Sequence, residues 1–230
     1  MNRALGAALL LSLAIGCARG GDMPLNRVAM RESHPRTIAL VRGNTPSPGF
    51  PRFFRLCSDA RRTYPCADVA GWVNSARSNE LANNSGIADP SIEIAETLMA
   101  ALSKKYSLAR MEGVTIRAPV TVAELSKPDY PQADLILAVG TLGWGFGPIG
   151  RGQSHVSYRG TIGLIDMRSK AVVARATCTY NPLPNDDDPQ YDDVIANDFA
   201  LLKGWLHQAA ETCSDDYRLR ILGIYGSAAR

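Results

Sequence analysis

Histidine is scarce in this sequence, and the few histidines form no motif of a catalytic or metal site. The 230 residues include 3 histidines, His34, His155 and His207, and no His-Glu-x-x-His arrangement. A Gly-x-Ser-x-Gly nucleophile elbow, a phosphate-binding loop and a Cys-x-x-Cys zinc pair are also absent from the sequence. We therefore predict a protein that is not an enzyme and that needs no metal and no cofactor.

Two stretches match binding motifs only in part. The glycines of residues 145–150 have the spacing of a dinucleotide-binding loop, but Pro148 interrupts it and a strand is expected where the motif needs a helix. The aspartates at 186–188 and 192–193 suggest calcium, but the glycine and distal glutamate of an EF-hand loop are missing. A solvated acidic loop before a capped helix is the better interpretation.

Long apolar runs are also rare, and the clearest one stands at the N-terminus. Residues 4–15 are apolar except for Ser12, and they follow the polar, positively charged pair Asn2 and Arg3. The run is shorter than the roughly 20 residues of a transmembrane helix, and it has the length of a signal-peptide core. We therefore predict that residues 1–16 are a removable export signal.

The signal ends in Leu13-Ala14-Ile15-Gly16-Cys17, which resembles the lipobox of bacterial lipoproteins. The resemblance implies cleavage before Cys17 and acylation of its thiol and new amino group, so that Cys17 attaches the protein to membrane lipid. Ala18 after the cysteine implies, by the enteric-type sorting rule, a lipoprotein of the outer membrane that faces the periplasm. The alternative is an ordinary cut after Ala18, which gives a secreted or soluble periplasmic protein.

Four cysteines remain in the mature chain, and an even number in an exported protein favours two disulfides. Cys57 and Cys66 bracket a polar, arginine-rich stretch that a local bridge would pin. Cys178 and Cys213 both fall on apolar faces, so a bridge between them would fasten the last long helix to the sheet. We favour these two pairings and leave the other two connectivities open. Zinc binding by four thiolates is disfavoured because the usual spacing is missing.

The segment after Cys17 is basic and has no hydrophobic period. Nine arginines, no lysine and three acids lie between Arg19 and Arg62. These arginines either contact anionic lipid near the anchor or belong to a solvated tether. Nucleic acid is not expected as a partner, because interleaved aromatic residues are missing and the chain is exported. We predict a lipidated N-terminus and flexible tether at residues 17–36 and a single periplasmic α+β domain at residues 37–230.

Periodicity within the domain predicts strands and two amphipathic helices. Strands are expected at residues 37–41, at 114–122 with an interruption at Pro119, at 134–139, and as a hairpin at 156–165 and 171–180. One helix runs from the cap residue Asp89 through Pro90 to Tyr106, and another covers residues 192–212. Residues 217–224 alternate enough for an extra strand.

These elements define an α+β fold, in which a mainly antiparallel sheet of about five strands carries two amphipathic helices on one face. The architecture resembles small periplasmic lipoproteins that serve as accessory or assembly factors. The sequence thus favours a membrane-anchored, non-enzymatic accessory, scaffold or interaction protein with an unidentified envelope partner.

One stretch is a candidate partner or ligand surface. It consists of Leu142, Trp144 and Phe146 on one face of a strand, with glycines on the other, and of the following loop to His155. Core packing of the aromatic residues is the plainer interpretation. Two functional alternatives stay open. A lipid or small-ligand carrier requires a cavity beside Trp144 and Phe146, and a hydrolase requires His155 or His207 beside a carboxylate.

Overall fold

The structure is a computed structural model that describes residues 21–43, 86–116, 132–149, 153–183 and 188–225. Cys17, Cys57 and Cys66 lie outside the described residues, and so do the export signal and the lipobox. Predictions for these positions therefore stay predictions.

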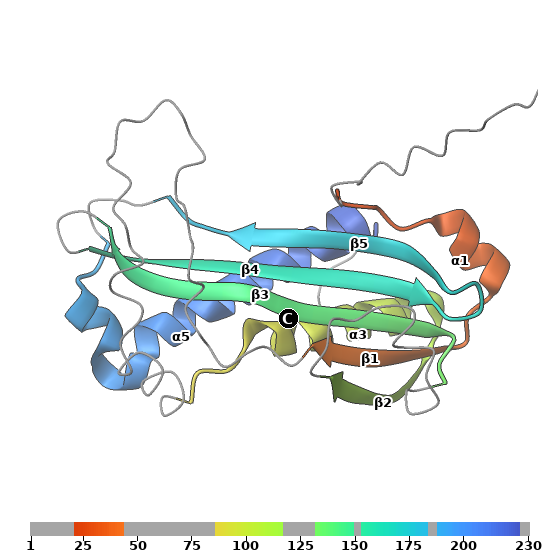
Figure 1. Ribbon diagram of the computed structural model, residues 1–230, viewed down its shortest axis with the longest axis horizontal. Helices are drawn as coiled ribbons and strands as arrows, with labels where there is room; N and C mark the ends of the chain where they lie inside the picture. The colour runs from red at the N-terminus through yellow and green to blue at the C-terminus, as the bar shows by residue number, and fades with distance from the viewer. Residues whose placement is uncertain (1–20, 44–85, 117–131, 150–152, 184–187, 226–230) are drawn as a thin grey trace, which may run out of the picture.

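The described strands form one five-stranded sheet in the order β2-β1-β3-β4-β5 (Figure 1). They are β1 (Thr37–Gly43), β2 (Ala109–Ile116), β3 (Leu135–Ile149), β4 (Gln153–Asp166) and β5 (Ala171–Tyr180). Strand β1 is parallel to both β2 and β3, whereas β3, β4 and β5 pair antiparallel. The α+β class with a five-stranded sheet is confirmed, and the sheet is mixed, because two of its four strand pairings are parallel. A helix separates β1 from β2 in the chain, and such a crossover returns the chain in the parallel direction.

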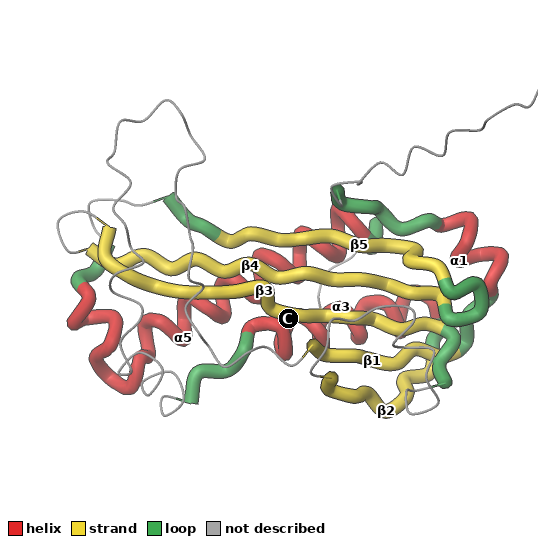
Figure 2. The backbone as a smooth tube through the Cα atoms, viewed as in Figure 1, coloured by secondary structure: helices red, strands yellow, loops and turns green. Residues whose placement is uncertain are grey.

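Two long helices, α3 (Pro90–Tyr106) and α5 (Tyr191–Asp216), cover one face of the sheet, as the sequence predicts (Figure 2). Asp89 caps α3, because its side chain accepts a hydrogen bond of 2.8 Å from the Ser91 N–H, and Pro90 occupies the first turn. Apolar residues three and four positions apart then place Leu98 and Leu102 in the main core, where both are fully buried.

The apolar runs of β1 and β3 lack alternation because both faces of these strands are buried. Ile38 and Leu40 belong to the core under the helices, whereas Ala39 and Val41 belong to a second cluster on the other face. The two faces of β3 are divided between the same clusters. A strand that is buried on both sides has no polar face, so its sequence is a short uninterrupted hydrophobic run.

The last helix is interrupted, which the sequence pattern does not predict. The backbone from Ala196 to Phe199 is not helical, and Asn197, Asp198 and Phe199 have positive φ angles. Asn and Asp tolerate this left-handed region better than most residues, whereas Phe does not. The break leaves a short first segment and a long second one, and Figure 1 shows the bend at the start of α5.

The extra strand predicted at residues 217–224 was wrong. The chain there forms a π-helical turn, η2 (Tyr217–Ile221). Tyr217 and Ile221 are both buried, and their spacing of four residues fits one face of a helical turn as well as it fits alternate positions of a strand.

The flexible tether was wrong for residues 21–36, because this segment packs against the domain. Its helix α1 (Arg27–Ser33) is capped by the Asn26 side chain, and Leu25 and Met30 are buried in the main core. The backbone of Met23 exchanges hydrogen bonds of 2.8 and 3.0 Å with Arg175 of β5. Ordering comes from these contacts with a distant strand, so no local periodicity reveals it.

The edges of the sheet differ in how they are covered. The N-terminal segment lies along β5, which protects that edge. Strand β2 forms the other edge, and its residues 109–113 are exposed. The pairing of β1 with β2 is irregular where Leu40 of β1 lies opposite two residues of β2, and a Cβ atom at Gly113 would meet the Leu40 carbonyl oxygen at 2.6 Å.

Gly113→Ala is therefore expected to lower the free energy of unfolding by about 1–3 kcal/mol, because one of two paired backbones must shift. Gly140→Ala is the matched control: it lies in β3, and a Cβ atom there meets nothing within 4 Å. Urea unfolding of both variants checks the difference. Equal stabilities of the two variants would contradict the close approach of β1 and β2.

Candidate functional site

The predicted surface around Trp144 is divided by a β-bulge. The pairing of β3 with β4 shifts between Thr141 and Gly143, which places Leu142 in the irregularity. Leu142 is 55% exposed, whereas Trp144 is 7% exposed and belongs to the main core. A bulge adds one residue to a strand and changes the side to which that residue points. The prediction that Leu142 and Trp144 share one face was therefore wrong.

The other two residues of that surface also have structural neighbours. Phe146 stacks on Tyr191 at the start of α5, with ring centroids 5.6 Å apart and an interplanar angle of 12°. His155 lies within 2.9 Å of the Asn181 side-chain oxygen, measured from Nε2. The aromatic rings thus pack β3 against α5, and the four residues do not converge on one pocket.

A separate open recess lies between α3 and the β1–β2 edge of the sheet. Its lining is mixed, with apolar side chains beside Arg42, Glu96 and Arg110. None of the four residues of the predicted surface lines it. The recess therefore does not provide the apolar cavity beside Trp144 that a lipid carrier requires.

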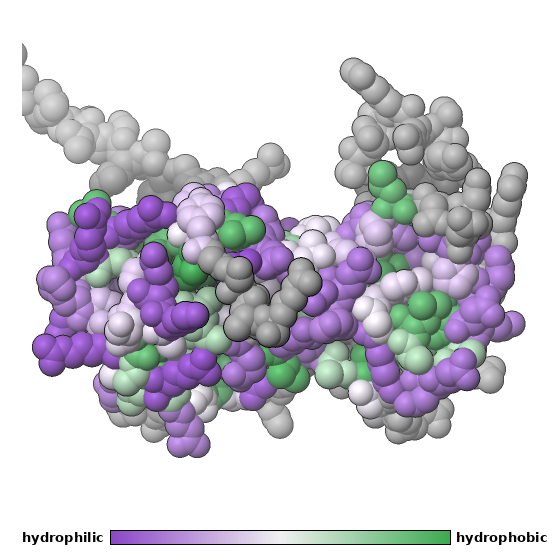
Figure 3. Space-filling view, turned by 180° about the vertical axis from the view of Figure 1, so that it is seen from behind, coloured by the Kyte–Doolittle hydropathy of each residue, from purple (hydrophilic) through white to green (hydrophobic). Residues whose placement is uncertain are grey.

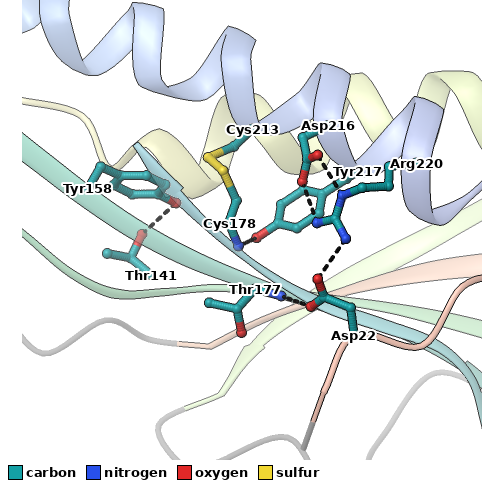
Figure 4. Close-up of a disulfide and its surroundings, with 9 residues drawn as sticks. All are labelled: Asp22, Thr141, Tyr158, Thr177, Cys178, Cys213, Asp216, Tyr217 and Arg220. Atoms are coloured by element: carbon teal, nitrogen blue, oxygen red, sulfur yellow. Dashed lines mark hydrogen bonds and ion pairs between the residues drawn. A yellow bond between two sulfur atoms is a disulfide. The ribbon is translucent and has the colours of Figure 1, made fainter. Parts of the chain in front are cut away.

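The second half of the molecule is organised around a disulfide between β5 and α5 (Figure 4). Cys178 and Cys213 are bonded, which is the pairing that the sequence favours, and their Cα atoms are 5.6 Å apart. The helix reaches Cys178 because α5 begins beyond the end of β5, beside the long β3–β4 ribbon (Figure 1). Closing a loop with a sequence separation of 35 contributes about 3–4 kcal/mol in the chain-entropy model.

A buried tyrosine completes this junction. The backbone N–H of Cys178 donates a hydrogen bond of 2.9 Å to the Tyr217 hydroxyl oxygen. Burial raises the pKa of Tyr217, so its hydroxyl remains neutral. The contact satisfies a backbone donor inside the core, which would otherwise carry a desolvation penalty of about 1–3 kcal/mol.

Charged groups fasten the N-terminal segment to the same junction. One oxygen of Asp22 accepts a hydrogen bond of 3.0 Å from the Thr177 N–H, and the other lies 2.7 Å from Arg220. Arg220 also pairs with Asp216 at 2.8 Å. The hydrogen bond from Arg220 and then that from Thr177 lower the pKa of Asp22. The segment that follows the predicted anchor is thus fixed to β5 and η2 (Figure 4).

The sequence pattern does not reveal the roles of Asp22, Tyr217 and Arg220. The spacing of Asp216 and Arg220 is a signal for a pair on one helical face. No signal connects Asp22 to Arg220, because the two residues are 198 positions apart.

A second buried polar group joins α3 to the sheet. The Thr141 hydroxyl donates to the Asp89 carboxylate, and it lies 3.2 Å from the hydroxyl of Tyr158 in β4. Burial raises the pKa of Tyr158, which keeps this hydroxyl neutral. The group holds the capped start of α3 on strands β3 and β4.

Among the described residues, His207 is the histidine that contacts a carboxylate. Its Nδ1 atom lies 2.8 Å from Glu93 of α3, and its Nε2 atom lies 3.7 Å from Glu211. The side chains of His207 and Glu93 are 58% and 42% exposed, so the pair connects two helices at the surface. The hydrogen bond and charge of Glu93 raise the pKa of His207. The arrangement is an interhelical ion pair in solvent, and no nucleophilic side chain is among its partners in the described chain.

Two features are absent from the described residues. These residues contain no group of three or more His, Cys, Asp or Glu side chains placed to hold a metal ion. Within the same part of the chain, every helix is too short or too polar to cross a lipid bilayer.

The chain matches no protein-family model, and no curated protein matches it. Among solved structures it is similar to PelC, a dodecamer from Paraburkholderia phytofirmans, with 14% identity over 76% of this chain and 86% of that one and a TM-score of 0.33. Protein XCC0632 from Xanthomonas campestris, described as family-model DUF330, has 14% identity over 78% and 82% and a TM-score of 0.34. Lipoprotein GNA1162 from Neisseria meningitidis has 12% identity over 54% and 88% and a TM-score of 0.26. Similarities this low lead to no conclusion about the activity of the chain.

Replacing His207 by Gln is expected to remove a pH-dependent contribution to stability. A raised pKa in the folded state means that the contribution is complete below the ordinary value of 6.5 and is lost as the pH rises through the raised pKa. Because the pair is exposed, the effect is at most about 1 kcal/mol. Urea unfolding of both proteins at pH 5.5 and pH 9 checks it: the difference should be present only at the lower pH. A difference that persists at pH 9 would contradict the ion pair.

Proposed function

We propose that the protein is a lipoprotein of the bacterial cell envelope that acts as a non-enzymatic accessory or interaction protein. Acylated Cys17 anchors it in the outer membrane, and the α+β domain faces the periplasm. The observation that carries the proposal is the position of the first described residues: the chain is bound to β5 from Gly21 onward, only four residues after Cys17.

This short connection gives the anchor a mechanical role. Four residues span at most about 14 Å, so an acylated Cys17 holds the domain directly beside the bilayer. The contacts of Asp22 with Thr177 and Arg220 hold the N-terminal segment on the domain. The disulfide between Cys178 and Cys213 supports an oxidising compartment such as the periplasm.

The two alternative functions have less support from the described residues. A ligand carrier needs space beside Trp144 and Phe146, whereas Trp144 is in the core and Phe146 stacks on Tyr191. A hydrolase needs a histidine and carboxylate in a water-excluding site, whereas His207 and Glu93 form an exposed pair. Leu142 is the member of the predicted surface that is largely exposed, and it is our candidate contact for an envelope partner.

The lipid anchor is tested by two substitutions at neighbouring positions. In cells, Cys17→Ala should move the protein out of the membrane fraction, because no thiol remains for acylation. Ala18→Gln should leave membrane association and mobility of the mature form unchanged, because it blocks only an ordinary signal cut, which requires a small residue before the cleaved bond. The opposite result, with normal maturation of Cys17→Ala and retention of the signal in Ala18→Gln, would show an ordinary secreted protein.

The partner is tested by a photoreactive amino acid at Leu142. Irradiation of intact cells should trap one defined envelope protein, which mass spectrometry identifies. The same amino acid at Leu219, an exposed apolar position in η2, is the matched control and should not give that adduct. Identical adduct patterns at both positions, or no protein adduct at Leu142, would contradict a partner at the bulge.

A further inference from the structure

One end of the molecule carries an excess of basic side chains. It is the end formed by α1, the turn between β4 and β5, the C-terminus of α3 and the first residues of β1 and β2 (Figure 1). The basic end, as we name it, consists of Arg27, Arg31, Arg36, Lys104, Lys105, Arg110, Arg168 and Lys170, all of which are exposed. The same end is largely hydrophilic on the helix side of the molecule (Figure 3).

Hydrogen bonds show that these segments are contiguous. Arg168 of the β4–β5 turn donates to the Ser33 carbonyl at the end of α1, at 2.6 Å. The Arg36 carbonyl accepts a hydrogen bond of 2.8 Å from Ala109 at the start of β2. Arg110 donates to the Ser103 hydroxyl in the last turns of α3. The basic residues therefore belong to one surface, although they come from five parts of the chain.

The acidic groups at this end do not balance the positive charge. Among the described residues they are Glu32, Glu96, Glu112, Asp134 and Asp166, five acidic side chains against eight basic ones. Asp134 accepts hydrogen bonds from the Arg36 and Thr37 backbone, which lower its pKa, and it lies 3.7 Å from Arg168. Asp166 is buried and accepts from the backbone N–H groups of the β4–β5 turn. Among the described residues, Arg168 is the member of the basic end that has an ion pair.

Among the described residues, acidic side chains dominate the opposite end of the molecule. The first turns of α5 and the residues before them carry Asp188, Asp192, Asp193 and Asp198, and Lys203 is paired with Asp198 at 2.6 Å. Beside the basic end, the aspartates at the end of α5 are compensated, because Asp215 pairs with Arg218 and Asp216 pairs with Arg220. The charges of the described residues are thus separated along the long axis, with positive charge near α1 and negative charge near the start of α5.

The N-terminal segment connects the predicted anchor to the basic end. The chain passes from Gly21 along β5 and enters α1, whose Arg27 and Arg31 belong to the basic end. Val28 between them is 56% exposed, so this helix presents an apolar side chain among basic ones. Bacterial phospholipids such as phosphatidylglycerol have anionic headgroups, and each basic residue near such a surface strengthens binding about fivefold.

We propose that the basic end is a docking surface for anionic phospholipid headgroups, which orients the domain with α1 on the bilayer and the start of α5 pointing away from it. The proposal rests on the lipoprotein function, because an acylated Cys17 keeps the domain, and with it this end, close to the membrane. A free protein partner is the less suited occupant, because the anchor already places lipid phosphates within reach of the basic side chains.

Binding of the unlipidated mature chain to vesicles tests the docking surface. Residues 17–230 with Cys17→Ser should sediment with vesicles of phosphatidylglycerol and phosphatidylcholine, and not with phosphatidylcholine alone, and added salt should weaken the binding. Lys104→Gln with Lys105→Gln should lower the partition coefficient by up to about 30-fold, because two basic residues are lost.

Two further double variants show whether a loss of binding comes from the basic end itself, from the lower net charge or from misfolding. Arg36→Gln with Lys170→Asn removes two other basic residues outside the helices; Asn suits Lys170, whose φ is positive. This pair should weaken binding to the same extent. Arg159→Gln with Lys203→Gln is the matched control, because it removes two charges elsewhere and should leave binding nearly unchanged. Circular dichroism verifies the fold of each variant.

Three results would overturn the docking surface. They are equal binding to both kinds of vesicle, equal losses in the control and the basic-end variants, and vesicle binding that survives both basic-end pairs. If these pairs instead remove a protein adduct in cells, the basic end binds a protein. The anchor is judged separately from Cys17→Ala in cells, so docking and anchoring can fail independently.

Discussion

Strand β5 receives segments from both ends of the chain at two adjacent residues, and the arrangement of the molecule depends on this junction. Cys178 is bonded covalently to α5 and donates its N–H to Tyr217, while the N–H of Thr177 binds Asp22. The disulfide keeps α5 close to the sheet, and η2 then presents Arg220 to Asp22. Without the covalent link, α5, η2 and the N-terminal segment would be held by packing, by the hydrogen bonds of Met23 and Tyr217 with β5 and by exposed ion pairs, and exposed pairs contribute little.

Much of the fold follows from local pattern. The Asp89 cap, the apolar stripe of α3 and the alternation around Cys178 each depend on residues within a few positions, and the structure contains them as predicted. The features that the pattern does not reveal depend on distant contacts. Helix α1 has seven residues and buries only Met30, so its position comes from the backbone bonds to β5. The bulge at Leu142 and the break at residues 196–199 are also absent from the periodicity.

The candidate surfaces also depend on features that the local sequence pattern does not reveal. In a regular strand, alternation would place the side chains of Leu142 and Trp144 on one face of the sheet. The bulge inserts one residue into β3, and every side chain after it points to the opposite face from the one that alternation predicts. The basic end comes from five segments, and within each segment one or two basic residues are unremarkable at a helix terminus or in a turn. Only the topology, which brings the starts of β1 and β2 beside the end of α3 and the β4–β5 turn, turns them into a single charged surface.

The short connection between Cys17 and the first described residues limits what the protein can reach in the proposed anchored form. Strand β3 has 15 residues and is about 50 Å long, so the domain extends no farther than roughly that distance from the bilayer. Leu142, at the middle of this strand, would lie at an intermediate height above the membrane. A partner that binds there must hold its own binding site within this shallow layer. Encounters would then be confined to two dimensions, and partners that diffuse in the same membrane would have the advantage.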